Sequence, residues 1–494
     1  SAAARLGLVA RQLLGDASDP QSLSRVVSRG CPGYEETLQR NWCGNVCFSG
    51  APVVPASIAE LQEAVRDGEG PIRVVGRGHS FTPVAECAGG TLLSLARLNR
   101  VVHFEPPTQD RVGSITVEGG TTYTEIAQFL GRRGALRNLP SCPQFTVAGA
   151  IATGTHGSGV HIQNLAADIA MLEFVKADGS LIRYSRQDRP ELLEGCRVHL
   201  GCLGVVSRLS LDVVPFYDVE TYCYVDAPLD SVIDNLQDLW QSCDSLSFWT
   251  SGFGHGPGVG TGWLMFRHFA PHWNPSLVAP VHKRAEMLGG ATLLEVPMNR
   301  YCTDVDTPSK FCPTGRGAWH DRLSLTLDEA HETSMTVVDL QAEFFVPLEH
   351  ARAAIHAVRD TARQWTFSSP LGHKGQPVKG LVDAMEFRQV KGDNAWLSPQ
   401  AVDSLGIHVS FNGDPARRAD VLQALPALEC ALKPFRARAH WGKLAPLTFT
   451  PSCLDDLYGE RLQKFRSLCK AHDPDGKFRN TYIQTMLFPS ELRT

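Results

Sequence analysis

The sequence lacks the features that membrane proteins and nucleic-acid-binding proteins need. It contains no run of about 18 or more apolar residues, so no segment predicts a membrane-spanning helix. No stretch of basic residues is long enough to suggest a nucleic-acid surface, and 47 Lys and Arg against 52 Asp and Glu give a net charge of −5. We therefore expect no nucleic acid as a partner and no transmembrane segment.

Short motifs of several catalytic classes are also missing. There is no HExxH and no pair of CxxC motifs, so no metal site is expected. The absence of GxSxG argues against a serine hydrolase, and the absence of GxGxxG argues against a Rossmann nicotinamide site. The 14 cysteines are scattered, which favours a reducing compartment over a disulfide scaffold. A soluble, cytoplasmic protein is favoured, and an organelle stays open.

The length of 494 residues predicts two or three domains, and 43% hydrophobic residues provide a large core. Residues 1–40 carry arginines among Ala, Ser and Leu and are expected to be a helical N-terminal extension, with the remnant of a targeting segment as the alternative. The composition shifts after Pro215, where aromatic residues become frequent. We expect a first domain over 41–215, a second over 216–440, and a C-terminal segment, 441–494, that returns to the first.

Helix and strand patterns alternate in the first domain. Capping boxes of the form S/T-x-x-E begin at Ser57 and Thr122, and each predicts the start of a helix. Asp178-Gly179 predicts a hairpin turn between two strands. The predicted strands of this part cover residues 72–75, 169–175, 180–184 and 205–214.

Three glycine-rich segments follow or join these elements. The first, Gly76-Arg77-Gly78-His79-Ser80-Phe81, comes directly after a predicted strand, where glycine lets backbone N–H groups approach an anion such as a pyrophosphate. The second covers 149–159, where small side chains would let a flat ligand lie against the backbone. The third is Gly119-Gly120. Alone, the first segment would more commonly be a tight turn, but the three together indicate a nucleotide cofactor.

These segments resemble those of a known family. Residues 41–45, 76–81 and 153–159 are similar to motifs of the vanillyl-alcohol-oxidase superfamily of FAD enzymes, and 440–443 and 473–480 match its sugar-oxidising branch, the aldonolactone and alditol oxidases. The resemblance spans roughly residues 41–485. It implies an α+β fold with a two-part FAD-binding domain of the PCMH type. It also implies a substrate-binding cap domain built on an antiparallel sheet with flanking helices.

Within that branch the pattern is most similar to the alditol oxidases, in segments 138–143, 384–388, 408–410 and 440–443. The resemblance implies FAD bound covalently through His79. The cofactor site that it implies comprises Gly76, Arg77, Gly78, His79, Ser80, Gly119, Ser141, Gly149, Gly154, Thr155, His156, Gly157, Ser158, Val206, His440 and Lys443. The implied substrate residues are Ser141, Glu386, Arg388, His408, Ser410 and Lys443, and all of these except Ser410 are also implied to be catalytic.

Two positions depart from the family pattern. Ser410 stands where a Thr is expected and keeps the hydroxyl. Pro140 stands where the family has Ala or Gly beside the isoalloxazine, a position that controls access of oxygen.

The residues of the implied substrate site also have simpler interpretations. Glu386 and Arg388 are two apart, so on a strand both point to one face, where they form either a surface ion pair or a site for vicinal hydroxyls. A lysine such as Lys443 is commonly just solvated, and a histidine such as His408 between apolar neighbours is commonly a core residue.

The predicted function is FAD-dependent oxidation of a primary alcohol of a polyol to the aldose. Hydride passes to flavin N5, and reoxidation by O2 gives H2O2. The alternative is an aldonolactone oxidase or dehydrogenase of the kind that makes ascorbate-like products. From another class, a non-catalytic flavin- or sugar-binding protein would carry the same cofactor motifs.

Overall fold

A computed structural model describes residues 40–250, 252–253, 260–269, 281–294, 314–324, 339–366 and 380–489. The expected N-terminal extension and most of the glycine-rich stretch 252–262 lie outside the described residues. No helix in the described part of the chain combines the length and the apolar character needed to cross a membrane.

The first half of the chain folds as its capping boxes and periodicity predict. Ser57 and Thr122 are the N-caps of α2 and α3, and each side chain accepts a hydrogen bond from the backbone N–H three residues on. Its α-helices are α2 Ile58–Asp67, α3 Tyr123–Leu130, α4 Val147–Ala152 and α5 Pro190–Arg197. Its strands are β1 Ile72–Val75, β2 Thr91–Ser94, β3 Val101–Glu105, β4 Gly113–Glu118, β5 Ile169–Val175, β6 Leu181–Ser185 and β7 Val205–Val213. The predicted strands are thus confirmed to within a residue at their ends.

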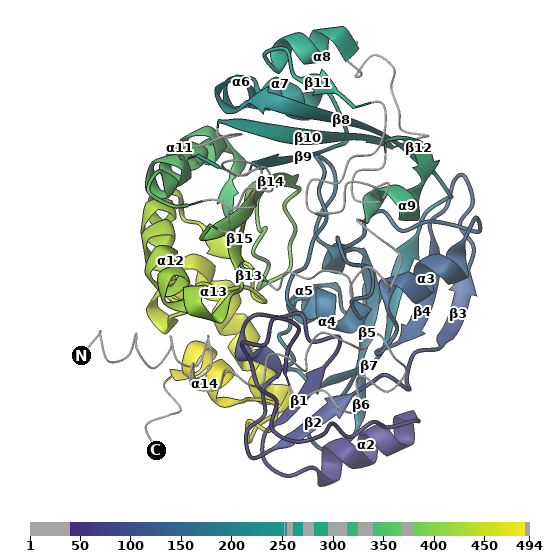
Figure 1. The fold of residues 1–494 in the computed structure, drawn as a ribbon. Helices are drawn as coiled ribbons and strands as arrows, with labels where there is room; N and C mark the ends of the chain where they lie inside the picture. Colours follow the sequence, from purple (N-terminus) through teal and green to yellow (C-terminus); the bar gives the residue numbers. More distant parts are fainter. Residues whose placement is uncertain are drawn as a thin grey trace.

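These strands form two separate sheets. Strands β1 and β2 pair in parallel, and α2 packs beside them through the buried Leu61 and Val65. The other five strands form an antiparallel sheet in the order β3-β4-β7-β5-β6. Figure 1 shows the small sheet at the bottom of the molecule and the five-stranded sheet to its right.

The second half is built on one large antiparallel sheet. Its nine strands run in the order β11-β8-β10-β9-β14-β15-β13-β16, with β12 also paired to β8. The strands are β8 Asp218–Pro228, β9 Ser245–Thr250, β10 Thr261–Phe269, β11 Thr292–Leu293, β12 Gly315–Ala318, β13 Asp339–Pro347, β14 Val382–Val390, β15 Ser404–Asn412 and β16 Arg438–Ala439. The helices are α6 Leu229–Asp234, α7 Leu236–Gln241, α8 Val281–Met287, α9 Trp319–Leu323, α11 Ala351–Ala362 and α12 Arg418–Leu432. This arrangement confirms the α+β class and the antiparallel sheet with flanking helices.

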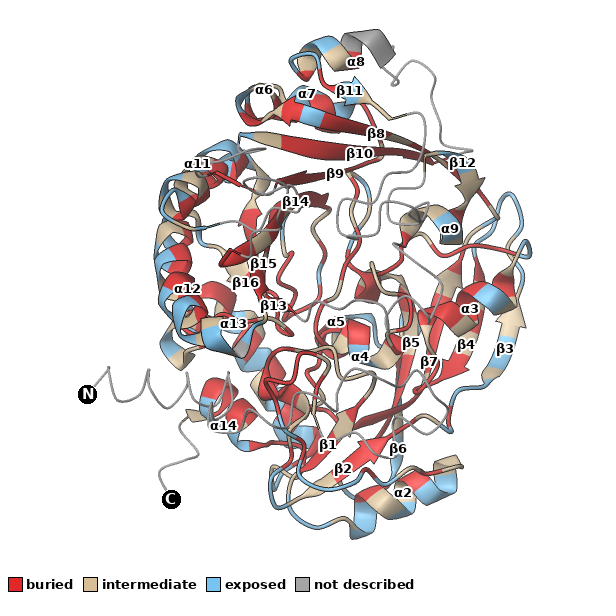
Figure 2. Ribbon diagram, in the orientation of Figure 1, coloured by how far each residue is buried: buried red, intermediate tan, exposed pale blue. Residues whose placement is uncertain are grey.

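Helices cover one face of the large sheet, and the first half of the chain lies against the other (Figure 1). On the helix side, Phe248 of β9 stacks on Phe387 of β14 at 5.4 Å between ring centroids, in the same core as Ile355 of α11. Figure 2 shows the strands buried, with exposed residues on the outer surfaces of α11 and α12. Because side chains alternate along a strand, the neighbours of these aromatic residues point to the opposite, inner face.

The C-terminal segment packs back on the small sheet. It contains α13 Pro451–His472 and α14 Thr481–Leu487. The backbone N–H of Ile72 donates to the carbonyl of Lys477 at 2.7 Å, and the Asn480 side chain donates to the carbonyls of Pro83 and Glu86.

Short 3-10 helices also connect elements along the described part of the chain. They are η3 Pro83–Ala85, η4 Leu165–Asp168, η6 Leu348–His350, η8 Pro415–Arg417 and η9 Lys433–Phe435.

Candidate functional site

The loop that contains His79 is held between two segments that are far apart in the sequence. The backbone N–H of Trp42 donates to the carbonyl of Gly78 at 2.8 Å, and that of Phe81 donates to the carbonyl of Gly442 at 2.7 Å. The side chain of Asn41 donates to the carbonyl of Ser80. Three of the segments that carry the family resemblance, 41–45, 76–81 and 440–443, therefore meet at one place.

Two of the glycine segments meet at Thr146, and none of the three segments has room for a side chain at the position described next. A Cβ built on Gly76 would lie 2.5 Å from Thr146 Oγ1, and one built on Gly149 would lie 2.8 Å from the same atom. A Cβ on Gly119 would lie 2.1 Å from the carbonyl oxygen of Val206. Glycine is therefore required at these positions by the close packing of the protein itself.

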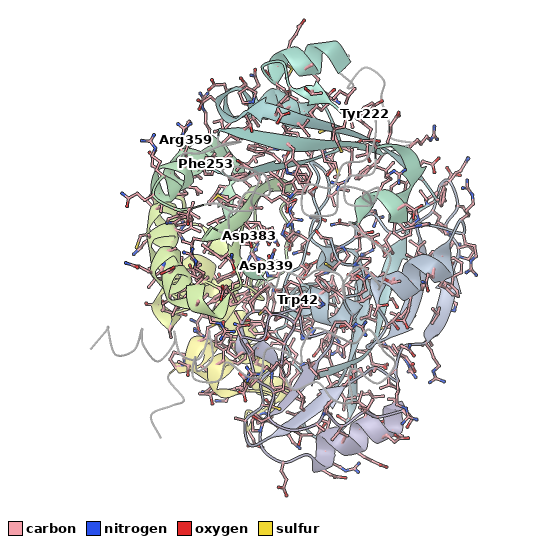
Figure 3. The ribbon with its side chains drawn as sticks, in the orientation of Figure 1. Trp42, Tyr222, Phe253, Asp339, Arg359 and Asp383 are labelled. Carbon is pink, nitrogen blue, oxygen red and sulfur yellow. The ribbon has the colours of Figure 1, made fainter. Side chains whose placement is uncertain are left out.

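The surroundings of His79 fit a bound flavin. Its ring stacks on Trp42 at 5.5 Å between centroids and lies 4.6 Å from Phe145 (Figure 3 labels Trp42). Beside Phe145, the amide of Gln144 is 1% exposed, and neither its nitrogen nor its oxygen has a hydrogen-bond partner in the described part of the protein. A buried amide without partners is costly, so the site has hydrogen-bonding capacity to offer a polar ligand. The residues present thus fit FAD, with His79, Gln144 and the glycine segments as those that would hold it.

A pocket lies where the inner face of the large sheet meets the first half of the chain. Of the six residues implied as substrate ligands, Ser141, Glu386 and Arg388 line this pocket. The other lining residues are Asn138, Leu139, Gly157, Ser158, Ser245, Ser247, Trp249, Arg267 and Leu323. Glu386 and Arg388 do share one face of β14, as their spacing predicts, and Arg388 Nε lies 3.4 Å from Glu386 Oε1.

Sequence reasoning missed the residue at the centre of this face, Glu343 of β13. Its carboxylate lies 2.9 Å from Lys443 Nζ, 2.9 Å from Arg388 Nη2 and 3.0 Å from His156 Nε2. Burial alone would raise the pKa of Glu343, but the charges of Lys443 and Arg388 and the hydrogen bond from His156 outweigh it and hold the pKa well below its usual value. Glu343 is therefore an anion that bridges two cations.

His408, Ser410 and Lys443 form a chain of hydrogen bonds behind the pocket. Lys443 Nζ donates to His408 Nδ1 at 2.8 Å, and His408 Nε2 lies 3.1 Å from Ser410 Oγ. Burial and the charge of Lys443 lower the pKa of His408, so the ring is neutral. Because Nδ1 accepts from Lys443, the ring proton lies on Nε2 and is donated to Ser410. These three residues do not line the pocket itself but join it through Glu343.

His156 links the glycine-rich segment to this charged group. Its Nδ1 lies 2.7 Å from the carbonyl oxygen of Gly157, while Nε2 faces Glu343. Burial lowers the pKa of His156 in spite of Glu343, and a neutral ring donates to only one of these two oxygens at a time. His440 lies nearby, with Nδ1 accepting from the Gly442 N–H at 3.0 Å, and burial holds its pKa well below the usual value. Both histidines therefore act as neutral hydrogen-bonding groups.

Four of the other lining residues come from β9 and β10, which carried no recognised motif, and Leu323 is the last residue of α9. Ser245, Ser247 and Trp249 alternate along β9, and Arg267 of β10 is the register partner of Ser245. The alternation of polar and apolar residues in 245–248 is a signal of a two-faced strand. It does not indicate which face meets the cofactor domain, so the sequence alone gave no reason to place these residues in a site.

Comparisons with known proteins identify relatives over almost the whole chain. Residues 50–185 match the family model for the FAD binding domain, and residues 326–486 match that for D-arabinono-1,4-lactone oxidase. The chain is 31% identical to alditol oxidase of a Streptomyces species, over 91% of this chain and 99% of the relative. It is 26% identical to L-gulonolactone oxidase of Mus musculus, over 92% of this chain and 99% of the relative. It is 28% identical to L-gulono-1,4-lactone dehydrogenase of Mycobacterium tuberculosis, over 91% of this chain and 99% of the relative.

The contact between Gly157 and Asn138 provides a test of the pocket. A Cβ at position 157 would lie 2.0 Å from Asn138 Oδ1 and 2.9 Å from the Leu139 carbonyl, so Gly157→Ala must displace two lining residues. We expect the purified variant to lose most of its flavin, measured as the ratio of visible to ultraviolet absorbance. Gly89→Ala is the control, because no neighbour lies within 4 Å of a Cβ there and its φ of +70° confines the strain to the local backbone. Wild-type flavin content in Gly157→Ala would show that the cofactor does not need this approach.

Proposed function

The chain belongs to the family of FAD-dependent alditol and aldonolactone oxidases, and from this membership we propose that it oxidises a primary alcohol of an open-chain polyol to the aldose. The observation that carries the proposal is the pocket in which Ser141, Glu386 and Arg388 converge. An alditol presents a hydroxyl, both donor and acceptor, at each carbon. A site with a carboxylate, a guanidinium and hydroxyls offers partners of both kinds.

Oxidation of an alcohol removes a hydride and a proton from the substrate. Bound FAD supplies the hydride acceptor, N5 of its isoalloxazine. Arg388 in the pocket lining, with Lys443 behind it, favours the negative charge that develops on the substrate oxygen as its proton leaves. Glu386 accepts a hydrogen bond from a neighbouring hydroxyl, and Ser141 bonds another. His408 and Ser410 lie behind the pocket and hold Lys443 there through their hydrogen-bond chain.

The proposal includes the cofactor linkage, the domain roles and the electron acceptor. FAD is bound covalently through His79, within a FAD-binding domain of residues 41–215 that the segment 441–494 completes. Residues 216–440 form the substrate domain. Molecular oxygen accepts the two electrons and two protons and becomes H2O2. The support comes from the buried amide of Gln144 next to Phe145, which has no partner among the described residues, and from the name of the Streptomyces relative.

A second candidate, oxidation of an aldonolactone, has its own support. One family model is named for D-arabinono-1,4-lactone oxidase, and the mouse and mycobacterial relatives are named for gulonolactone. The pocket favours the alditol, because a lactone has fewer hydroxyl donors and makes less use of a carboxylate such as Glu386.

The covalent link predicts a simple outcome for the protein as purified. Acid-precipitated protein should remain yellow, and His79→Ala should release its FAD into the supernatant on the same treatment. His103→Ala, on the exposed part of β3, is the matched control and should keep its flavin. A colourless wild-type precipitate with FAD in solution would refute the link.

Substrate preference is expected in steady-state rates. Alditols such as xylitol or sorbitol should give a higher kcat/KM than gulono- or galactonolactone, because buried polar groups of the site are left unpaired by a ligand with fewer hydroxyls. Glu386→Gln should lose on the order of 1–3 kcal/mol of transition-state stabilisation, and Arg388→Ala and Lys443→Ala more. The control is Glu349→Gln, which replaces a glutamate whose side chain is 79% exposed and should leave kcat/KM unchanged. Faster turnover of a lactone than of any alditol would make the chain an aldonolactone enzyme.

The position of Pro140 leads to a prediction about the rate at which oxygen reoxidises the reduced flavin. Pro140 is buried between Leu139 and Ser141, which both line the pocket. We expect air to reoxidise the reduced flavin in a stopped-flow experiment at a rate at least equal to turnover, and Pro140→Ala, with a smaller side chain, to be faster. Slow reoxidation of both proteins, with rapid turnover on an artificial acceptor, would identify a dehydrogenase instead.

A further inference from the structure

Glu343 does not line the pocket, yet its carboxylate contacts Arg388, which does, and Lys443 behind it. The Glu343 side chain is 1% exposed. Oε1 accepts from Arg388 Nη2 and lies 3.0 Å from His156 Nε2, and Oε2 lies 2.9 Å from Lys443 Nζ. The partners come from three separate parts of the chain: β14, the glycine-rich segment and the loop after β16.

We propose that Glu343 is a positioning residue, which fixes Arg388 and Lys443 for substrate oxidation and contributes one buried negative charge that lowers the reduction potential of the bound flavin. The role in oxidation rests on the proposed function. The effect on the flavin rests only on the presence of FAD.

The geometry of the ion pairs supports the proposed positioning of Arg388 and Lys443. Arg388 and Lys443 bond opposite oxygens of one carboxylate, so a single anion sets the position of both cations. Without it, two like charges would face each other in a poorly solvated region, where their repulsion is strong. The Lys443 ammonium would then keep only the neutral His408 as a described partner. Arg388 would keep Glu386 as its remaining ion-pair partner, at 3.4 Å, so the repulsion would shift both cations from their present positions.

The contact between Glu343 and His156 supports the proposed effect on the reduction potential of the flavin. His156 belongs to the glycine-rich segment 149–159, and its Nε2 faces Glu343 at 3.0 Å. Phe345, two residues along β13, packs edge-to-face on His156 at 4.9 Å and holds the ring in place. A negative charge this close to the flavin segment opposes electron gain by the flavin, because reduction adds negative charge to the isoalloxazine.

Two substitutions in the FAD-loaded protein separate charge from geometry. Glu343→Gln removes the charge, so we expect a more positive midpoint potential and at least about a tenfold lower limiting rate of flavin reduction by xylitol. Glu343→Asp keeps the charge on a shorter side chain, so we expect a near-wild-type potential with a reduced rate. The potential is measured by dye-coupled reductive titration, which needs no substrate, and therefore tests Glu343 even if alditols fail to reduce the wild-type protein.

The control is Glu173→Gln in β5. Glu173 is also a buried strand carboxylate bonded to two arginines, Arg183 and Arg208, but it lies in the five-stranded sheet. It should change neither the potential nor the rate. If Glu343→Gln does not retain FAD, the Glu343→Asp protein carries the test. A wild-type reduction rate in Glu343→Asp, or an unchanged potential in FAD-loaded Glu343→Gln, would overturn the proposal.

Discussion

The buried carboxylate of Glu343 is the interaction on which the charged part of the site depends. A buried ion without a partner costs several kcal/mol, so Arg388 in the pocket lining and Lys443 behind it need the anion that lies between them. One carboxylate serves both cations and also bonds His156 on the cofactor side. The same contact therefore assembles strand β14, the loop after β16 and the glycine-rich segment into one centre.

The two faces of the nine-stranded sheet explain why such a centre exists. One face is apolar and packs on helices, and the other carries Glu343, Glu386, Arg388 and His408, which in most sheets of this kind would face water. Here the first half of the chain covers that polar face. Its charges and hydroxyls must therefore bond one another or a ligand, and a hydroxyl-rich substrate meets that need.

Short sequence patterns correctly predicted the features that depend on neighbouring residues, such as helix starts and the faces of strands. The capping boxes at Ser57 and Thr122 mark helix starts, and the two-residue spacing of Glu386 and Arg388 puts them on one face of a strand. Glu343 was missed because it lies among apolar residues in 340–346 and belongs to no motif. Its importance comes from register: His408 of β15 pairs with Glu343 on one side and Glu386 on the other. Such long-range pairing is not encoded in any short stretch of sequence.

Anaerobic mixing of the purified protein with xylitol tests most directly whether this polar pocket oxidises a polyol. In the absence of oxygen the visible absorbance of oxidised flavin should bleach completely, with one aldose formed for each flavin reduced, whereas gulono- and galactonolactone should bleach it far more slowly. A protein that stays yellow with every alditol but bleaches with a lactone, or with neither, would contradict the account.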